Sequence, residues 1–243
     1  MALHRKIDAL MALRPDLAVI PEAGAPERLV ERVPALAEAS LVWVGKNPNK
    51  GLLLAGFGTT LLDFDRNRCD DSLHWIAPVA VRGLPGLEGP LHLLGVWAQN
   101  ASEGNRRKDN PGYVQQALGR YRRFLRSAPS VVAGDFNNHV QWDRPGWKMN
   151  HANEIRSLAR LGLVSAYHVS RGIEAGNESE PTLYWRSRTY HIDYVFMPEE
   201  WTKGSFDLTV GRYEDWIGSG LSDHVPLVLE VTQRENRGLQ RQS

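Results

Sequence analysis

Three apolar segments of the chain carry acidic, amide or imidazole side chains at or next to one end. Asp135 and Asn137 follow the first segment, Asp193 lies in the second, and Asp223 and His224 precede the third. Residues two apart on an extended strand project to one side, so Asp135 and Asn137 place a carboxylate beside an amide. Such groups, converging at one edge of a β-core, suit a metal-assisted hydrolase. A plain turn at 134–137 is the alternative, because Gly, Asp and Asn favour turns.

The ordered motifs Gly-Asp-Phe-Asn (134–137), Ile-Asp-Tyr (192–194) and Ser-Asp-His (222–224) resemble those of the endonuclease/exonuclease/phosphatase superfamily. An apolar segment over 16–22 also ends in a carboxylate, Glu22, and the resemblance covers nearly the whole chain. It implies an α/β (α+β) fold like that of DNase I, a four-layer sandwich of two packed mixed β-sheets flanked by helices. We expect one domain over 1–233 and a disordered tail over 234–243.

The resemblance also implies roles for the site residues. Glu22 and Asp223 would bind Mg²⁺, with Mn²⁺ as an alternative ion, since hard cations take oxygen ligands. Asp135 would orient or deprotonate the attacking water, and Asn137 would donate a hydrogen bond to the phosphorane oxygens. Asp193 would pair with His224 and raise its pKa. Whether His224 then acts as a general base or as an electrostatic stabiliser stays open.

Six further residues are candidates for substrate binding. Trp97 and Asn100 occupy the places where many relatives of the family carry a tyrosine and an asparagine, although Trp97 could equally be a core residue. The loop residues Arg106, Arg107 and Lys108 offer positive charge for a phosphate backbone. His191 shares the polar face of its strand with Asp193. The arginines of 120–126 fit an outer, solvated helix face instead.

The beginning of the sequence departs from the family pattern. Relatives begin with a strand that ends in Trp-Asn, ahead of the helix that here starts at Met1. We expect either that the sequence lacks a segment ahead of Met1 or that a partner supplies the strand, because an unfilled place would expose sheet edges. We predict no other protein partner.

Composition limits the class of protein. The chain has 243 residues, 42% of them hydrophobic, and a formal net charge of +1. A sizeable core is therefore available, but no global charge recruits a polyanion. The single cysteine, Cys69, excludes an internal disulfide and a zinc-thiolate site. Because no apolar run is long enough for a signal peptide or a membrane span, we expect a soluble cytoplasmic protein.

The elements that must position these residues follow from hydrophobic periodicity and from Gly and Pro breaks. Helices are expected over 3–13, 26–38, 111–127 and 152–161. Strands are expected over 17–20, 41–44, 51–55, 73–81, 91–97, 130–133, 182–185, 192–196, 208–210 and 225–231.

The leading hypothesis is a Mg²⁺-dependent nuclease that hydrolyses DNA or RNA by in-line attack of water. A phosphatase or phosphodiesterase for a small phosphorylated molecule or lipid head group is the second, favoured by the near-neutral charge. A catalytically silent homologue is the third. The choice between DNA and RNA, and between endo and exo action, stays open, because fold likeness does not supply it.

Overall fold

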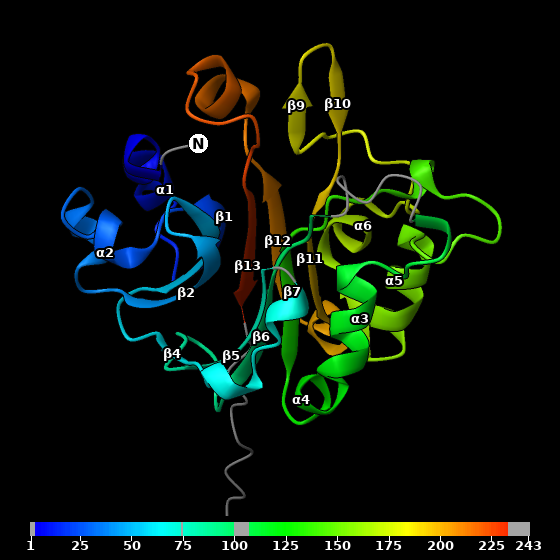
Figure 1. Cartoon of the computed structure of the whole chain (residues 1–243), viewed down its shortest axis with the longest axis horizontal. Helices are drawn as coiled ribbons and strands as arrows, with labels where there is room; N and C mark the ends of the chain where they lie inside the picture. The colour runs from blue at the N-terminus through cyan, green and yellow to red at the C-terminus, as the bar shows by residue number, and fades with distance from the viewer. Residues whose placement is uncertain (1–2, 74, 100–106, 233–243) are drawn as a thin grey trace, which may run out of the picture.

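Two layers of strands pack face to face between two layers of helices (Figure 1). The computed structural model describes residues 3–73, 75–99 and 107–232. The predicted α/β sandwich is confirmed. The tail expected over 234–243 lies outside the described residues.

The larger sheet has six strands in the order β4-β5-β6-β7-β11-β8. These are β4 (Leu61–Asp63), β5 (Ile76–Arg82), β6 (Leu91–Trp97), β7 (Ser130–Asp135), β11 (Asp193–Pro198) and β8 (Leu163–Ser165). Strands β6 and β7 are parallel and the other neighbours are antiparallel, which makes the sheet mixed. The central strands read as continuous apolar runs because both faces of the sheet are covered.

The facing layer consists of two antiparallel pieces. One has the order β1-β3-β2, with β1 (Leu17–Ala23), β2 (Ser40–Asn47) and β3 (Lys50–Gly56), and the other pairs β12 (Ser205–Val210) with β13 (Leu227–Thr232). Among the described residues, β1 pairs only with β3 and β13 only with β12. A separate hairpin joins β9 (Leu183–Trp185) to β10 (Arg188–Tyr190).

Helices cover the outer faces of both layers. The three-stranded piece is flanked by α1 (Ile7–Ala12) and α2 (Pro26–Leu29) (Figure 1). The large sheet is flanked by α3 (Tyr113–Arg120), α4 (Arg122–Arg126) and α5 (His151–Ala159). Helix α6 (Ala166–Arg171) packs near β8 and β11. The helix expected over 26–38 is wrong beyond Leu29. Proline disfavours a helical conformation in the residue before it, and Val33 (φ −137°, ψ 76°) precedes Pro34 and a short 3₁₀ turn.

Three apolar cores join the four layers, as layer architectures require. In β3, Leu52 and Leu54 pack between the two strand layers, whereas Leu53 faces the helix α1 side. This alternation follows from the two-residue period of a strand. A third core, containing Phe136 and Tyr194, lies between the large sheet and its helices. No helix in the described part of the chain is long and apolar enough to cross a bilayer.

Candidate active site

Five of the predicted site residues meet at one end of a cavity of about 590 Å³. The side chains of Glu22, Asp135, Asp193, Asp223 and His224 all line it. They come from the end of β1, the end of β7, the start of β11 and the segment before β13. The strands thus bring together residues that lie far apart in the sequence.

The large sheet places Asp135 beside Asp193. The two residues are direct partners in the antiparallel register of β7 and β11. On the other side of β7, Gly134 lies directly beside Val96 of β6; its φ is +134° and a Cβ there would lie 1.9 Å from the Val96 carbonyl oxygen. Glycine is the residue that tolerates such a backbone.

Asn137 holds the Asp135 carboxylate. The Asn137 backbone N–H donates to Asp135 Oδ1 at 2.8 Å, and Asn137 Nδ2 donates to Asp135 Oδ2 at 2.7 Å and to the Ala98 carbonyl at 2.8 Å. Asn137 reaches this position with a left-handed φ of 46°. Its side-chain amide thus contacts Asp135 and the Ala98 carbonyl, and the predicted donation to substrate stays a prediction.

Asp135 is a buried carboxyl group, only 4% exposed. Burial and the nearby charge of Asp193 raise its pKa well above the ordinary value, although His224 and the Asn137 N–H oppose this shift. A raised pKa brings a carboxylate closer to the range in which a general base works at neutral pH.

Asp193 and His224 form a hydrogen-bonded pair. His224 Nδ1 lies 2.8 Å from Asp193 Oδ2. Although burial favours the neutral ring, the charge and hydrogen bond of Asp193 raise the pKa of His224 to about 9. The bond to Nδ1 leaves Nε2 as the ring nitrogen available to a ligand.

Two buried hydroxyl groups, which were not among the predicted site residues, support this pair. Thr182 Oγ1 accepts hydrogen bonds from the backbone N–H of Ile192 and of Asp193, both at 3.1 Å. Ser222 Oγ accepts from the His224 N–H at 3.2 Å. Only the Ser-Asp-His motif carried a signal for Ser222, while Thr182 lies outside every motif.

The two predicted metal ligands lie at the same end of the cavity. Glu22, in a left-handed conformation (φ 60°), forms an ion pair with Lys50 at 2.9 Å. Burial alone would raise the pKa of Glu22, but the hydrogen bond and charge of Lys50 lower it below the ordinary value. The Asp223 side chain is exposed. Within the described residues, no three His, Cys, Asp or Glu side chains already form a metal-binding cluster.

The donor chemistry still fits a hard cation. All the carboxylates at this end offer oxygen ligands, and Mg²⁺ needs one or two of them besides water and substrate. Glu22 would have to exchange Lys50 for the ion.

Two lysines complete the charge pattern of the site. Lys50 lies 2.9 Å from Glu22 and 5.3 Å from the centre of the Trp97 ring. Lys6 lines the cavity; burial lowers its pKa, while the charges of Asp223, Glu22 and Asp193 oppose this shift. Isolated lysines carry no local pattern, so the sequence did not indicate them.

Of the predicted substrate-binding residues, none of the four that the structure describes lines this cavity. Trp97 is 3% exposed and belongs to the core between the strand layers. His191 is buried behind the site, where its Nδ1 lies 2.7 Å from the Glu180 carbonyl. Asn100 and Arg106 lie outside the described residues.

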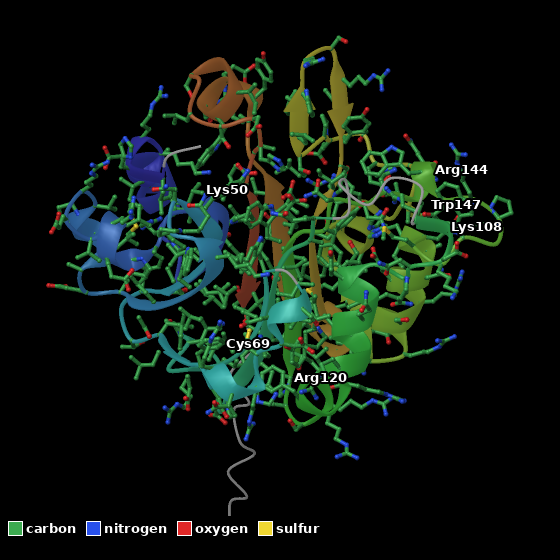
Figure 2. All side chains as sticks on the ribbon, viewed as in Figure 1. Lys50, Cys69, Lys108, Arg120, Arg144 and Trp147 are labelled. Atoms are coloured by element: carbon green, nitrogen blue, oxygen red, sulfur yellow. The ribbon has the colours of Figure 1, made fainter. Side chains whose placement is uncertain are left out.

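The remaining basic residues of the loop are also placed away from the carboxylates. Arg107 donates to Asn138 Oδ1 and its guanidinium lies 5.9 Å from the Trp142 ring centre. Lys108 is exposed, and Figure 2 shows it near Trp147, well separated from Lys50. Neither side chain lines the cavity.

Asn138 and His139, which directly follow the Gly-Asp-Phe-Asn motif, are buried. Asn138 Nδ2 donates to Glu154 Oε2 at 3.1 Å, and the same oxygen lies 2.7 Å from His151 Nδ1. His139 Nε2 lies 2.9 Å from Glu178 Oε2. The segment after the Gly-Asp-Phe-Asn motif is therefore anchored by buried polar contacts.

Comparison with solved structures gives the same overall fold. A 3'-5' exonuclease (NExo) of Neisseria meningitidis is 15% identical with a TM-score of 0.62 and 96% of each chain covered. An AP endonuclease of Archaeoglobus fulgidus is 17% identical with a TM-score of 0.62, covering 95% of this chain and 94% of that one.

An endonuclease/exonuclease/phosphatase structure of Beutenbergia cavernae is 20% identical with a TM-score of 0.54, covering 94% of this chain and 66% of that one. No family model and no curated protein matches the sequence. At these identities the similarity establishes the fold.

Proposed function

We propose that this chain, whose fold is that of the endonuclease/exonuclease/phosphatase superfamily, is a metal-dependent hydrolase of phosphodiester bonds in DNA or RNA. One observation carries the proposal. The buried Asp135 and the Asp193–His224 pair meet Glu22 and Asp223 at one end of a single cavity. Attack of water on a phosphoester requires carboxylates to hold a metal ion and a base to take a proton from the water. It also requires a positive group beside the phosphate, which an imidazole can supply.

Asp135 is assigned the role of base toward the attacking water. Asn137 fixes the carboxylate by two hydrogen bonds, and burial raises the pKa of Asp135, so its proton affinity increases. Asp135 removes the proton as the water oxygen bonds to phosphorus in line with the departing oxygen.

His224 is assigned the role of a positive group beside the phosphate. With a pKa of about 9 the ring is protonated near neutral pH, and Asp193 fixes its orientation through Nδ1. A protonated ring stabilises negative charge on the phosphoryl oxygens and can donate a proton to the departing oxygen. This favours the electrostatic role over that of general base.

Glu22 and Asp223 are the residues that would hold Mg²⁺ or Mn²⁺. Such an ion neutralises phosphate charge and polarises the phosphorus–oxygen bond when it is bound. Without the ion, Lys50 forms an ion pair with Glu22 and lowers the pKa of this carboxylate, which keeps it ionised.

The nucleic-acid substrate is supported by the two structural neighbours named as an exonuclease and an AP endonuclease. A second candidate, hydrolysis of a small phosphoester, is favoured by the net charge of +1 and by the engagement of Arg107 with Asn138. We place the activity in the cytoplasm, consistent with the single free Cys69.

Hydrolysis of a substrate panel tests the proposal. Single- and double-stranded DNA, abasic duplex, RNA and a generic phosphodiester would be incubated with Mg²⁺, Mn²⁺ or EDTA. Asp135→Asn and His224→Ala should each abolish a metal-dependent cleavage, while Asp63→Asn, the same carboxylate-to-amide change at an exposed pair with Arg82, should not. Cleavage of the generic ester alone would favour the second candidate. Absence of cleavage on every substrate would indicate a silent homologue.

A further inference from the structure

A buried carboxylate that does not line the cavity, that of Glu178, is held by two histidines. The Glu178 side chain is 1% exposed. His139 Nε2 lies 2.9 Å from Glu178 Oε2, and His168 Nε2 lies 2.8 Å from Glu178 Oε1. The backbone N–H of Gly176 also donates to Oε2, at 2.9 Å. Because Glu178 is absent from the cavity lining, it does not contact a substrate bound there.

The proton positions in this cluster follow from the remaining ring nitrogens. His139 Nδ1 accepts a hydrogen bond from the Gln141 backbone N–H at 3.0 Å, which leaves the ring proton on Nε2, facing Glu178. Although burial would raise the pKa of Glu178, the hydrogen bonds of His139, His168 and Gly176 lower it well below the ordinary value. Glu178 is therefore ionised and only accepts hydrogen bonds. A buried charge needs such donors, so the cluster has one favourable arrangement.

Glu178 lies between the two parts of the candidate active site. On one side it contacts His139, which follows Asn137 by two residues. The Asn137 side chain in turn donates to the Asp135 carboxylate. On the other side Glu178 begins the segment 178–182, which belongs to the connection between α6 and β9 (Figure 1).

The far end of segment 178–182 is bonded to both members of the Asp193–His224 pair or to their neighbours. Thr182 Oγ1 accepts from the Asp193 N–H at 3.1 Å. The Thr182 carbonyl accepts from the N–H of Val225, the residue after His224, at 2.9 Å. One residue thus joins two parts of the chain that are 31 positions apart.

We propose that Glu178 is a positioning residue for the reaction. It anchors the segment whose last residue, Thr182, holds the Asp193–His224 pair. The pair thereby keeps a fixed place relative to Asp135. This inference rests on the proposed function, in which Asp135 and His224 act on the same phosphate. Catalytic groups need surrounding contacts that lock them, since a misplacement of about 1 Å can cost on the order of 10²-fold in rate.

Amide hydrogen exchange of the full chain without substrate tests the positioning separately from hydrolysis. Glu178→Gln keeps the shape of the side chain but directs an NH₂ group at one of its donors. We expect the Ile192 and Asp193 amides to exchange at least about tenfold faster, because their hydrogen bonds to Thr182 open more often. Amides of strand β6 should exchange as before. Glu174→Gln, the same change at an exposed position of the same loop, is the matched control.

The rate of hydrolysis tests the consequence for the reaction. Glu178→Gln should lower kcat by about tenfold or more and leave KM within about twofold, because the side chain does not touch the substrate. Thr182→Val removes the hydroxyl acceptor and should have the same two effects, on exchange and on kcat. Thr182→Ser keeps the acceptor and should restore both. His168→Leu removes only one donor and should give a smaller change of the same kind, which keeps the test available if Glu178→Gln does not fold.

Three results would overturn the proposal. One is unchanged exchange at Ile192 and Asp193 in both Glu178→Gln and His168→Leu. Another is equally faster exchange in β6, which would show that Glu178 stabilises the fold as a whole. The third is an unchanged kcat despite faster local exchange. A wild type that cleaves no substrate would overturn the proposed hydrolysis instead, and the exchange measurement would then decide the positioning by itself.

Discussion

His224 Nδ1 and Asp193 Oδ2 lie 2.8 Å apart, although 31 positions separate the two residues in the chain. Asp193 is the main group that raises the pKa of His224 against the effect of burial. Replacing the carboxylate by an amide keeps a similar shape but removes the charge. We predict that Asp193→Asn lowers the pKa of the His224 ring and reduces hydrolysis by about 10²-fold or more.

The pH dependence of the rate and the ring signals of His224 in NMR spectra would measure this change. On the basic side of the pH–rate profile, the activity of Asp193→Asn should begin to fall at a lower pH than that of the wild type. An unshifted His224 titration in Asp193→Asn would contradict the pairing.

The same pair makes the stability depend on pH. The pKa of His224 is about 9 in the folded protein against an ordinary value of 6.5. The stabilisation is therefore complete below about pH 6.5 and is lost as the pH rises through about 9, by on the order of 1–3 kcal/mol. Urea denaturation at pH 6.5 and 9.5 would measure the loss. His224→Gln should flatten this dependence, and an equal slope in the variant would exclude His224 as its source.

Asp135 is expected to reduce stability while it serves catalysis. Its pKa is raised by burial and by Asp193, so the unfolded chain loses this proton at lower pH than the folded protein. Stability therefore falls as the pH rises from the ordinary value toward the folded pKa. We predict that Asp135→Asn melts at a higher temperature than the wild type at pH 7 without metal, yet is about 10²–10⁴-fold less active. A lower melting temperature would show that its hydrogen bonds to Asn137 outweigh the cost of burying charge.

Lys50 competes with a cation for Glu22. The two side chains form a half-exposed ion pair at 2.9 Å, a kind of contact that contributes only about 0–1 kcal/mol to stability. We predict that Lys50→Met binds Mg²⁺ and Mn²⁺ more tightly in calorimetric titration and changes the melting temperature little. Lys46→Met, at an exposed position of the neighbouring strand β2, is the matched control. Equal cation affinity in both variants would rule out the competition.

Asn138 is expected to stabilise the fold without taking part in the chemistry. Its side chain is fully buried, accepts from Arg107 and donates to Glu154. Asn138→Ala removes the acceptor of Arg107 and leaves Glu154 with His151 alone, which should cost about 2–4 kcal/mol in urea denaturation. Activity per folded molecule should stay within a few-fold of the wild type, and a loss as large as that of Asp135→Asn would place Asn138 in the site.

Local patterns predicted most elements and the chemistry of the site. Strand β6 has the predicted bounds, and β1, β7 and β11 begin within one residue of the predicted starts. The errors lie where local signals compete. The helix expected over 26–38 ends at Leu29, and Val33 before Pro34 is not helical. The short strands β4 and β10 contain too few residues for a visible period.

The sequence by itself determined which groups are available to the site, because carboxylate, amide and imidazole chemistry follows from residue type. It also indicated the strand ends that carry them, through apolar alternation. Only the tertiary structure decided that Lys50 pairs with Glu22 and that Asn137 donates both to Asp135 and to the Ala98 carbonyl. It also decided that Trp97 and His191 are buried and do not line the cavity. These contacts join segments that lie far apart in the sequence, and the cavity is lined by residues of β1, β7, β11 and β13. Such relations depend on packing between distant parts of the chain, which no local pattern encodes.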